Sequence, residues 1–258
     1  MADAFGEVLK NWRTRRRLSQ LDLALEADVS ARHLSFLETG RSRPSRGMVL
    51  RLSDVLAVPR AARNQLLSEA GYAPLYSARP ENAPDLAPLD AALDRMLATH
   101  DPYPGLALGQ DWSIRKLNRA AALLFGSAEI GIGDNLVGQT LDNPALKAAI
   151  LNHDEVIRHL LTRLRTEVAH FGDDPLRRAW IERITQDFPE ASDPPEEPQP
   201  AVVAIHYRTP LGDLSLFSTI AQFGTVEDIS YADIQIELMH PADESSRTIL
   251  QRIFQAAS

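Results

Sequence analysis

The chain has no cysteine and no long apolar run. The absence of cysteine excludes disulfides, thiolate metal ligands, thiol redox sensing and cysteine nucleophiles together. No stretch approaches the roughly 20 consecutive apolar residues that a helix needs to cross a bilayer. The first residues, 1–5, lack the charged and apolar regions of a signal peptide. We therefore expect a cytoplasmic protein that does not act at a membrane.

Catalytic and cofactor motifs are also missing. The sequence has no Gly-x-Ser-x-Gly elbow, no phosphate-binding Walker loop and no dinucleotide-binding glycine fingerprint. Its seven histidines show no metal-ligand spacing such as His-Glu-x-x-His. Acidic pairs such as Glu196 and Glu197 lie in a proline-rich stretch without a preorganised setting. The sequence thus predicts no catalytic residue, no metal and no cofactor, which argues against an enzyme.

The most informative segment that is present runs from Leu18 to Gly40. It reads as two short helices around a tight turn, the unit that places a helix in the major groove of DNA. Ser19 and Ser30 suit N-cap positions, because a hydroxyl accepts a hydrogen bond from an unpaired amide of the first turn. Gly40 suits the position after a helix end, where left-handed backbone is favourable.

Apolar residues of this segment recur at helical spacing. We expect Leu21 and Ala24 to be buried in the first helix, Val29 to fill the turn, and Leu34 and Leu37 to be buried in the second. With the flanking sequence, the pattern predicts five helices over residues 4–17, 19–27, 30–39, 46–58 and 60–70.

The pattern Leu-Ser-Gln, Leu and Ala, Val-Ser, Leu, then Leu-Glu-x-Gly-x-x-x-Pro, which ends at Pro44, resembles the XRE or lambda-repressor-like helix-turn-helix regulators over residues 4–72. The resemblance implies sequence-specific binding to double-stranded DNA, and it implies that Arg13 and Glu38 form a structural ion pair. A helical hairpin that only packs against another element is the alternative. The residues assigned to DNA contact are Gln20, Ser30, Ala31, Arg32, His33, Ser35, Phe36, Arg41 and Arg43.

Three of these positions carry distinct expectations. The resemblance implies that Gln20 anchors a phosphate or a neighbouring recognition side chain. Arg32 is the best candidate to read a base, because a guanidinium pairs bidentately with guanine. Phe36 stands where a polar residue is usual in the family, so it either contacts a thymine methyl group or packs against protein.

Charge is divided unequally along the chain. The whole sequence carries a net charge of −8, yet residues 1–80 carry a net +5 and residues 81–258 a net −13. Phosphate neutralisation by arginine supplies most of the sequence-independent affinity for DNA. The arginines around the helix-turn-helix segment are Arg13, Arg15, Arg16, Arg17, Arg41, Arg43 and Arg46.

Two proline-rich stretches divide the remainder. Residues 71–88 contain four prolines and read as a linker, and residues 189–200 contain five prolines with several acidic residues and read as an exposed loop. We therefore expect a DNA-binding domain over residues 1–72, a linker over 73–88 and a second domain over 89–258.

The second domain reads as an α+β fold. It opens with helical spacing from Leu89 to Leu97, and residues 103–126 then suggest a strand, a turn, a second strand and a helix that Asn118 starts. We expect a small antiparallel sheet with helices against one face. Further helices are expected within residues 156–171, 176–184 and 242–256, and further strands over 202–208, 214–223 and 233–239.

The strand, turn, strand and helix of residues 103–126 are also the opening pattern of PAS-like sensor domains. Together with Asp101-Pro-Tyr-Pro-Gly, Phe223-Gly-Thr and Pro241-Ala-Asp-Glu, this pattern resembles the ligand-binding domain of MmyB-like transcription regulators over residues 88–257. The resemblance implies an apolar cavity between sheet and helices that holds a fatty acid or a similar lipophilic molecule. The candidate lining residues are Leu106, Leu108, Trp112, Leu124, Phe125, Leu160, Leu164, Phe217 and Phe223, with His206, Tyr207 or Arg208 as a polar end.

The sequence therefore predicts a ligand-responsive regulator of transcription. A homodimer on a palindromic operator is expected, because one recognition helix reads only a few base pairs and two copies double the contacts. Two alternatives stay open. In one, apolar residues at these spacings form a solid core and the second domain only dimerises or binds another protein. In the other, the chain is an enzyme tethered to DNA.

Overall fold

The computed structural model describes residues 2–256 except 78, 80–82, 173, 194–201, 225 and 227. The chain divides into two compact units. The first holds residues 1–78 with the short segments 165–174 and 227–229, and the second holds the remainder. Within the described residues, no helix has the length and apolar character needed to span a membrane.

The predicted N-terminal helices are present. Ser19 and Ser30 cap α2 and α3, because the amides of Asp22 and His33 each donate a hydrogen bond to the serine hydroxyl three residues earlier, at 3.1 Å. The Asp22 carboxylate accepts from the Ser19 amide in return, which completes a capping box. The helices are α1 (Ala2–Arg15), α2 (Gln20–Glu26), α3 (Ala31–Glu38), α4 (Arg46–Val55) and α5 (Arg60–Glu69).

The core of this unit differs from the expected one at a single helix. Leu34 and Leu37 are fully buried as predicted, but Leu21 is 58% exposed and the prediction that it is buried is wrong. Leu23 takes its place beside Ala24, because successive residues point about 100° apart on a helix and positions 23, 24 and 27 share the inward face. The sequence alone did not decide which of two leucines faces the core.

Gly6 fixes how closely α1 approaches α3. A Cβ atom at Gly6 would clash with the backbone carbonyl of Glu38. The absence of a side chain at this position allows α1 to pack directly on the end of α3.

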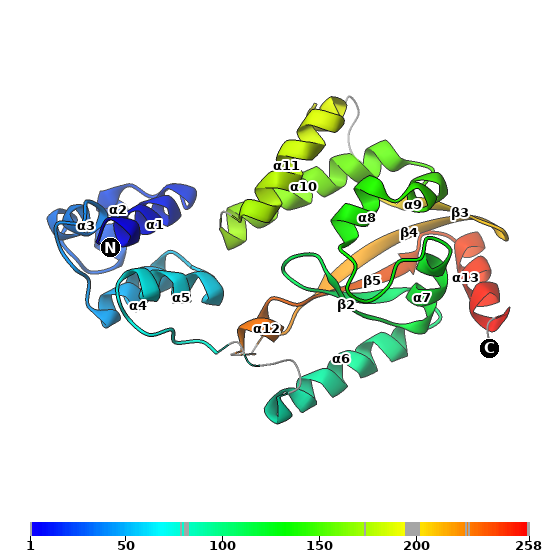
Figure 1. The fold of residues 1–258 in the computed structure, drawn as a ribbon, viewed down its shortest axis with the longest axis horizontal. Coiled ribbons are helices and arrows are strands. Elements are labelled where there is room, and N and C mark those ends of the chain that lie inside the picture. The colour runs from blue at the N-terminus through cyan, green and yellow to red at the C-terminus, as the bar shows by residue number, and fades with distance from the viewer. Residues whose placement is uncertain are drawn as a thin grey trace. The chain divides into compact units, whose positions relative to one another are not determined.

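The second unit is built on a five-stranded antiparallel sheet with strand order β2-β1-β5-β4-β3 (Figure 1). All five expected strands are confirmed, with ends that differ from the predicted ones by a few residues. Gly212, at φ 126°, completes the tight turn between β3 and β4. The strands are β1 (Gly105–Leu108), β2 (Ile114–Leu117), β3 (Ile205–Thr209), β4 (Gly212–Ala221) and β5 (Gln235–Pro241).

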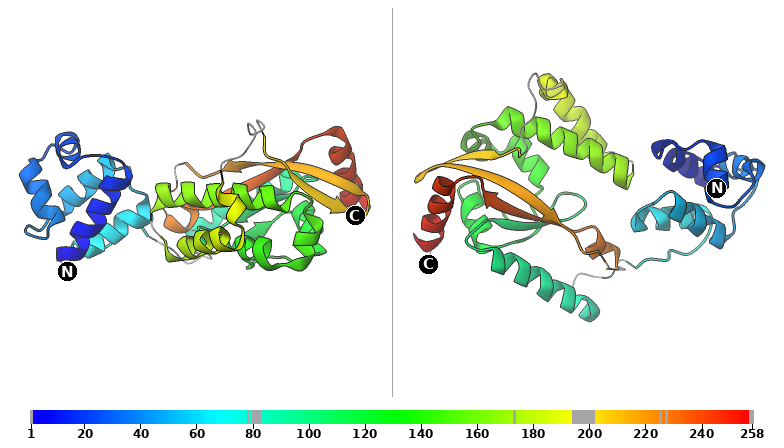
Figure 2. Two further views of the ribbon diagram at one scale, coloured as in Figure 1. Left: turned by 90° about the horizontal axis from the view of Figure 1, so that it is seen from above. Right: turned by 180° about the vertical axis from the view of Figure 1, so that it is seen from behind.

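Helices cover both faces of this sheet, so the expectation of helices against one face is wrong. On one face, α10 and its neighbours bury a large core that includes Leu106 and Leu216. On the other, α6 packs Leu93 and Leu97 against Ala107. Figures 1 and 2 show α6 across the sheet from α8 and α10. The helical elements are η1 (Pro84–Leu86), α6 (Ala87–His100), α7 (Arg119–Gly126), α8 (Leu136–Asp142), α9 (Pro144–Ala149), α10 (His153–Phe171), α11 (Pro175–Asp187), η2 (Pro189–Ser192), α12 (Ile229–Ala232) and α13 (Glu244–Ala256).

Both proline-rich stretches hold more structure than expected. Residues 84–88, assigned to the linker, begin the helical run of η1 and α6, and Leu86 is buried. Proline is compatible with the first turn of a helix, where its missing amide proton is not needed. In the second stretch, residues 189–192 form η2 with Ala191 buried. The rest of that predicted loop, residues 194–200, lies outside the described residues.

Asn118 joins three elements of the second unit. Its buried side chain caps α7 by accepting from the Ala121 amide, and it also accepts from the Gly105 amide at the start of β1. Its amide group donates to the carbonyls of Leu97 and Tyr103. The predicted cap residue therefore ties the end of α6 to the sheet as well.

Candidate DNA-binding surface and ligand cavity

An ion-pair network connects α1, α2 and α3. The Arg13 guanidinium donates to both carboxylate oxygens of Glu38, at 2.6 and 2.9 Å, and to the Leu18 carbonyl at 2.9 Å. The Gln20 amide donates to the same carboxylate at 2.7 Å. The Glu38 hydrogen bond raises the pKa of Arg13, so the guanidinium stays charged. The expected pair of Arg13 and Glu38 is thus present, and Gln20 belongs to this network.

The outward face of α3 carries the predicted recognition residues. Arg32 is exposed, and its guanidinium lies 5.3 Å from the ring centroid of half-buried Phe36. The Arg32 guanidinium therefore lies over the Phe36 ring in a cation–π contact, and the Arg32 residue stays exposed. Ala31 packs partly on the core, and His33 and Ser35 are half-buried.

The basic residues of this unit have two different roles. Arg16 donates to the carbonyls of Leu56 and Ala57 just past the end of α4, at 2.8 and 3.1 Å. It therefore acts as a cap. Arg41 and Arg43 are exposed, and neither makes an ion pair within the described part of the chain. Their positive charge remains available for phosphate groups.

A cavity of about 400 Å³ lies in the second unit between the helices α8 to α10 and the strands β3 to β5. Val202 and Ile220 line the cavity, yet each is about half exposed. The cavity therefore opens to solvent beside these two residues. The lining residues are Trp112, Phe125, Leu136, Val137, Thr140, Leu146, Ile150, Val156, His159, Leu160, Arg163, Val202, Val203, Ile205, Tyr207, Phe217, Ser218, Ile220, Glu237 and Met239.

The structure brings five of the twelve predicted lining residues to this cavity: Trp112, Phe125, Leu160, Tyr207 and Phe217. The other seven lie elsewhere. Leu106, Leu108 and Leu164 are buried in the solid part of the core. Leu124 faces a small space beside α13.

Strand alternation explains two of the remaining three differences, and Phe223 lies beyond the end of β4. Successive side chains of a strand point to opposite faces, so Tyr207 faces the cavity while exposed His206 and Arg208 face the other way. Phe223 packs near Tyr231 in the core on the α6 side of the sheet. The prediction of a polar end at His206 or Arg208 is therefore wrong.

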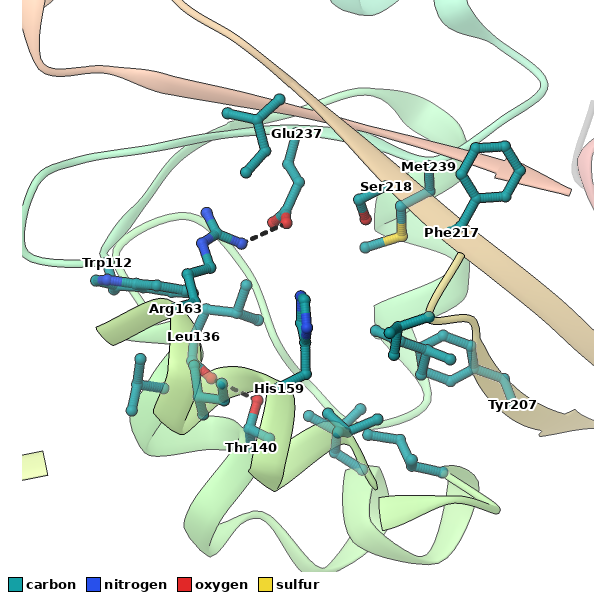
Figure 3. A pocket seen from close by; sticks show the side chains of 18 of the residues that line it. Trp112, Leu136, Thr140, His159, Arg163, Tyr207, Phe217, Ser218, Glu237 and Met239 are labelled. Atoms are coloured by element: carbon teal, nitrogen blue, oxygen red, sulfur yellow. Dashed lines mark hydrogen bonds and ion pairs between the residues drawn. The ribbon is translucent and has the colours of Figure 1, made fainter. Parts of the chain in front are cut away.

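The polar wall of the cavity is built around Arg163 instead. Its guanidinium donates to Glu237 at 2.7 Å and to the Gln235 side-chain oxygen at 2.6 Å, and it lies 4.2 Å from the ring centroid of Trp112. Figure 3 shows Arg163 reaching from α10 to Glu237 on β5, with Trp112 beneath it. Glu237 and Gln235 are both buried, so this positive charge is neutralised away from water.

Trp112 reaches this position through an uncommon backbone conformation. It has φ 61° in the turn between β1 and β2, a region that bulky residues rarely occupy. Its amide donates to the Gly109 carbonyl, and its own carbonyl accepts from Leu136, which starts α8. These two bonds hold the indole against Arg163.

His159 and Tyr207 contribute uncharged polar groups. Figure 3 shows the His159 ring standing in the middle of the cavity. Although the side chain is exposed through the cavity, partial desolvation and then the charge of Arg163 lower the pKa of His159, against smaller opposing effects of Glu237 and Glu155. Burial, and then the charge of Glu237, raise the pKa of Tyr207. Both residues are therefore neutral near pH 7.

Sequence reasoning missed Arg163, Glu237 and His159. Arg163 and His159 lie on the polar side of an amphipathic helix, where solvated charge is the usual interpretation. Glu237 alternates with apolar residues on β5 and follows Gln235 by two positions, so both share a face of the strand. Glu237, a carboxylate within a largely apolar predicted strand, was the one signal of this polar wall in the sequence.

Two family models match the sequence. One, described as a helix-turn-helix domain, matches residues 4–66. The other, described as the ligand binding domain of MmyB-like transcription regulators, matches residues 89–253, which is more than half of the chain. The chain belongs to the MmyB-like transcription regulators. No curated protein matches it.

The two matches divide this MmyB-like regulator close to where its structure does, except that the segments 165–174 and 227–229 of the first unit lie within the ligand-binding match. The helix-turn-helix match contains α2 and α3 with the exposed Arg32. The ligand-binding match contains all five strands and the lining of the cavity. The protein is therefore a DNA-binding regulator with a domain that binds a ligand.

Proposed function

We propose that this regulator senses a small lipophilic ligand with a single aliphatic chain, fatty-acid-like in shape, inside the cavity of its second domain. The observation that supports the proposal is the cavity of about 400 Å³ with a largely apolar lining and a polar wall at Arg163. Sites for small molecules are typically concave and apolar, with a few placed polar groups. The protein would act as a binding protein and not as an enzyme.

The DNA-binding part of the proposal is a homodimer that binds a palindromic operator. Exposed Arg32 on α3 supports base reading, and Arg41 and Arg43 support phosphate contact. The α2 and α3 caps and the network at Glu38 support the XRE resemblance, and the run of β1, β2 and α7 supports the PAS-like one. A regulator must share the compartment of its operator, which is the basis of a proposed cytoplasmic location.

The main alternative is a second domain that only dimerises or binds another protein. That function needs a filled core, whereas here apolar side chains border open space. Mass spectrometry of molecules released from the denatured pure protein tests this difference. We expect a lipophilic molecule, recovered in a near-stoichiometric amount.

Two neighbouring substitutions locate the site. Ser218 lines the cavity from β4, whereas Thr219, the next residue, is exposed on the opposite face of the sheet. Ser218→Trp should fill the cavity and abolish binding of added decanol, measured by calorimetry, and Thr219→Trp should leave it unchanged. If wild type neither releases nor binds a lipophilic compound, the dimerisation alternative is correct.

A further inference from the structure

The charges in the cavity wall are already paired with each other. Arg163 makes its ion pair with Glu237 at 2.7 Å, and their side chains are only 15% and 9% exposed. Gln235 and Trp112 occupy two further sides of the guanidinium. A ligand that enters the cavity therefore meets a wall whose fixed charges cancel.

The remaining polar groups of the lining are uncharged. Within the described residues, the His159 imidazole and the hydroxyls of Tyr207 and Ser218 line the cavity without a hydrogen-bond partner. Each can donate or accept a hydrogen bond. The Thr140 hydroxyl also lines the cavity, and it is satisfied by the Leu136 carbonyl at 2.8 Å.

We infer that the ligand carries an uncharged, hydrogen-bonding head group, an alcohol, ester or lactone, and not a free carboxylate. The inference rests on the proposed function and deepens it, because it selects among lipophilic ligands by their head group. His159, Tyr207 and Ser218 hydrogen-bond the head group (Figure 3), and the apolar lining receives the chain.

A carboxylate is disfavoured for two physical reasons. If it entered beside the intact pair, it would approach the Glu237 carboxylate without a cation of its own, and burial of an unpaired charge is strongly unfavourable. If it took Glu237's place at Arg163, it would leave Glu237 buried and unpaired. A neutral head group avoids both penalties.

The test compares decanol, methyl decanoate and decanoic acid on the full-length protein by titration calorimetry at pH 7.5, where the acid is ionised. We expect the affinities for decanol and for the ester to be at least about tenfold higher than the affinity for the acid. Equal or tighter binding of the acid would overturn the head-group inference and leave the lipophilic sensor standing. If none of the three binds, the proposed function itself fails.

Two variants test the cause. Glu237→Gln removes the negative charge and leaves Arg163 to receive a carboxylate, so affinity for decanoic acid should rise at least about fivefold while decanol still binds. Glu182→Gln, the same change at an exposed site on α11, should alter neither affinity. An unchanged ranking in a folded Glu237→Gln protein would refute the charge argument. If that variant does not fold, Tyr207→Phe should weaken decanol binding, and unchanged binding there would refute the hydrogen-bond argument.

Discussion

The network at Glu38 yields the most quantitative prediction, on the substitution Glu38→Ala. The Glu38 side chain is 2% exposed and accepts three hydrogen bonds, two from Arg13 and one from Gln20. Its removal leaves the Arg13 guanidinium, only 12% exposed, without a counter-charge. The Leu18 carbonyl, the other acceptor described for Arg13, cannot compensate for this charge.

The expected loss of stability follows from this burial. Removing one partner of a buried ion pair costs about 3–5 kcal/mol. Because the Arg13 side chain keeps some contact with solvent, which screens its unpaired charge, we place the loss near the lower end, at about 3 kcal/mol. For a domain of this size, about 1 kcal/mol changes the melting temperature by about 4–8 °C. Glu38→Ala should therefore lower the melting temperature of the helix-turn-helix domain by about 12–24 °C.

Scanning calorimetry of the full-length protein measures this change, because only the transition of the N-terminal domain should move. The matched control is Glu7→Ala, which removes an exposed glutamate of α1 and should change stability by no more than about 0.5 kcal/mol. Equal melting temperatures for Glu38→Ala and wild type would refute the assignment of Glu38 as the centre of a structural network.

Three further predictions concern other parts of the chain. Gly6→Ala should destabilise the helix-turn-helix domain, although alanine normally favours a helix interior by about 0.5–1 kcal/mol over glycine, because the new Cβ clashes with the Glu38 carbonyl; a higher melting temperature would contradict the close packing of α1 and α3. Arg32→Ala should lower discrimination at one base pair per half-site by about 1–3 kcal/mol, measured as the ratio of affinities for selected and scrambled duplexes; an unchanged ratio would show that Arg32 does not read a base. The lowered pKa of His159 means that the unfolded chain binds a proton at this residue more tightly than the folded chain does. The free energy of unfolding should therefore fall as the pH drops below about 6.5. His159→Phe should reduce this pH dependence in urea titrations, and an identical pH dependence in the variant and wild type would refute the prediction.

Most helices and strands of the fold could be predicted from local sequence patterns. The caps at Ser19, Ser30 and Asn118 were predictable because each is a short-range contact between a side chain and an amide three residues later. The strands were predictable from their apolar patterns and turn residues. The position of α6 on the other face of the sheet could not be predicted from the sequence. That position depends on which of the two apolar sheet faces the helix covers, and this is a property of the tertiary packing.

The cavity was less predictable than the fold. Apolar lining residues such as Phe125 and solid-core residues such as Leu164 share the same helical or strand spacing, and only their three-dimensional neighbours distinguish them. The polar wall was missed because Arg163 and Glu237 are 74 positions apart in the sequence. Neither residue signals a buried role without the other.

If the second domain is a sensor as proposed, a ligand bound there should change the affinity of the first domain for DNA. A duplex is selected from a random-sequence pool by the full-length protein, and its dissociation constant is measured with and without saturating decanol. We predict a change of about 5–150-fold, and thermodynamic linkage requires the duplex to change the decanol affinity by the same factor. Decanol binding that leaves the duplex affinity unchanged would contradict the account.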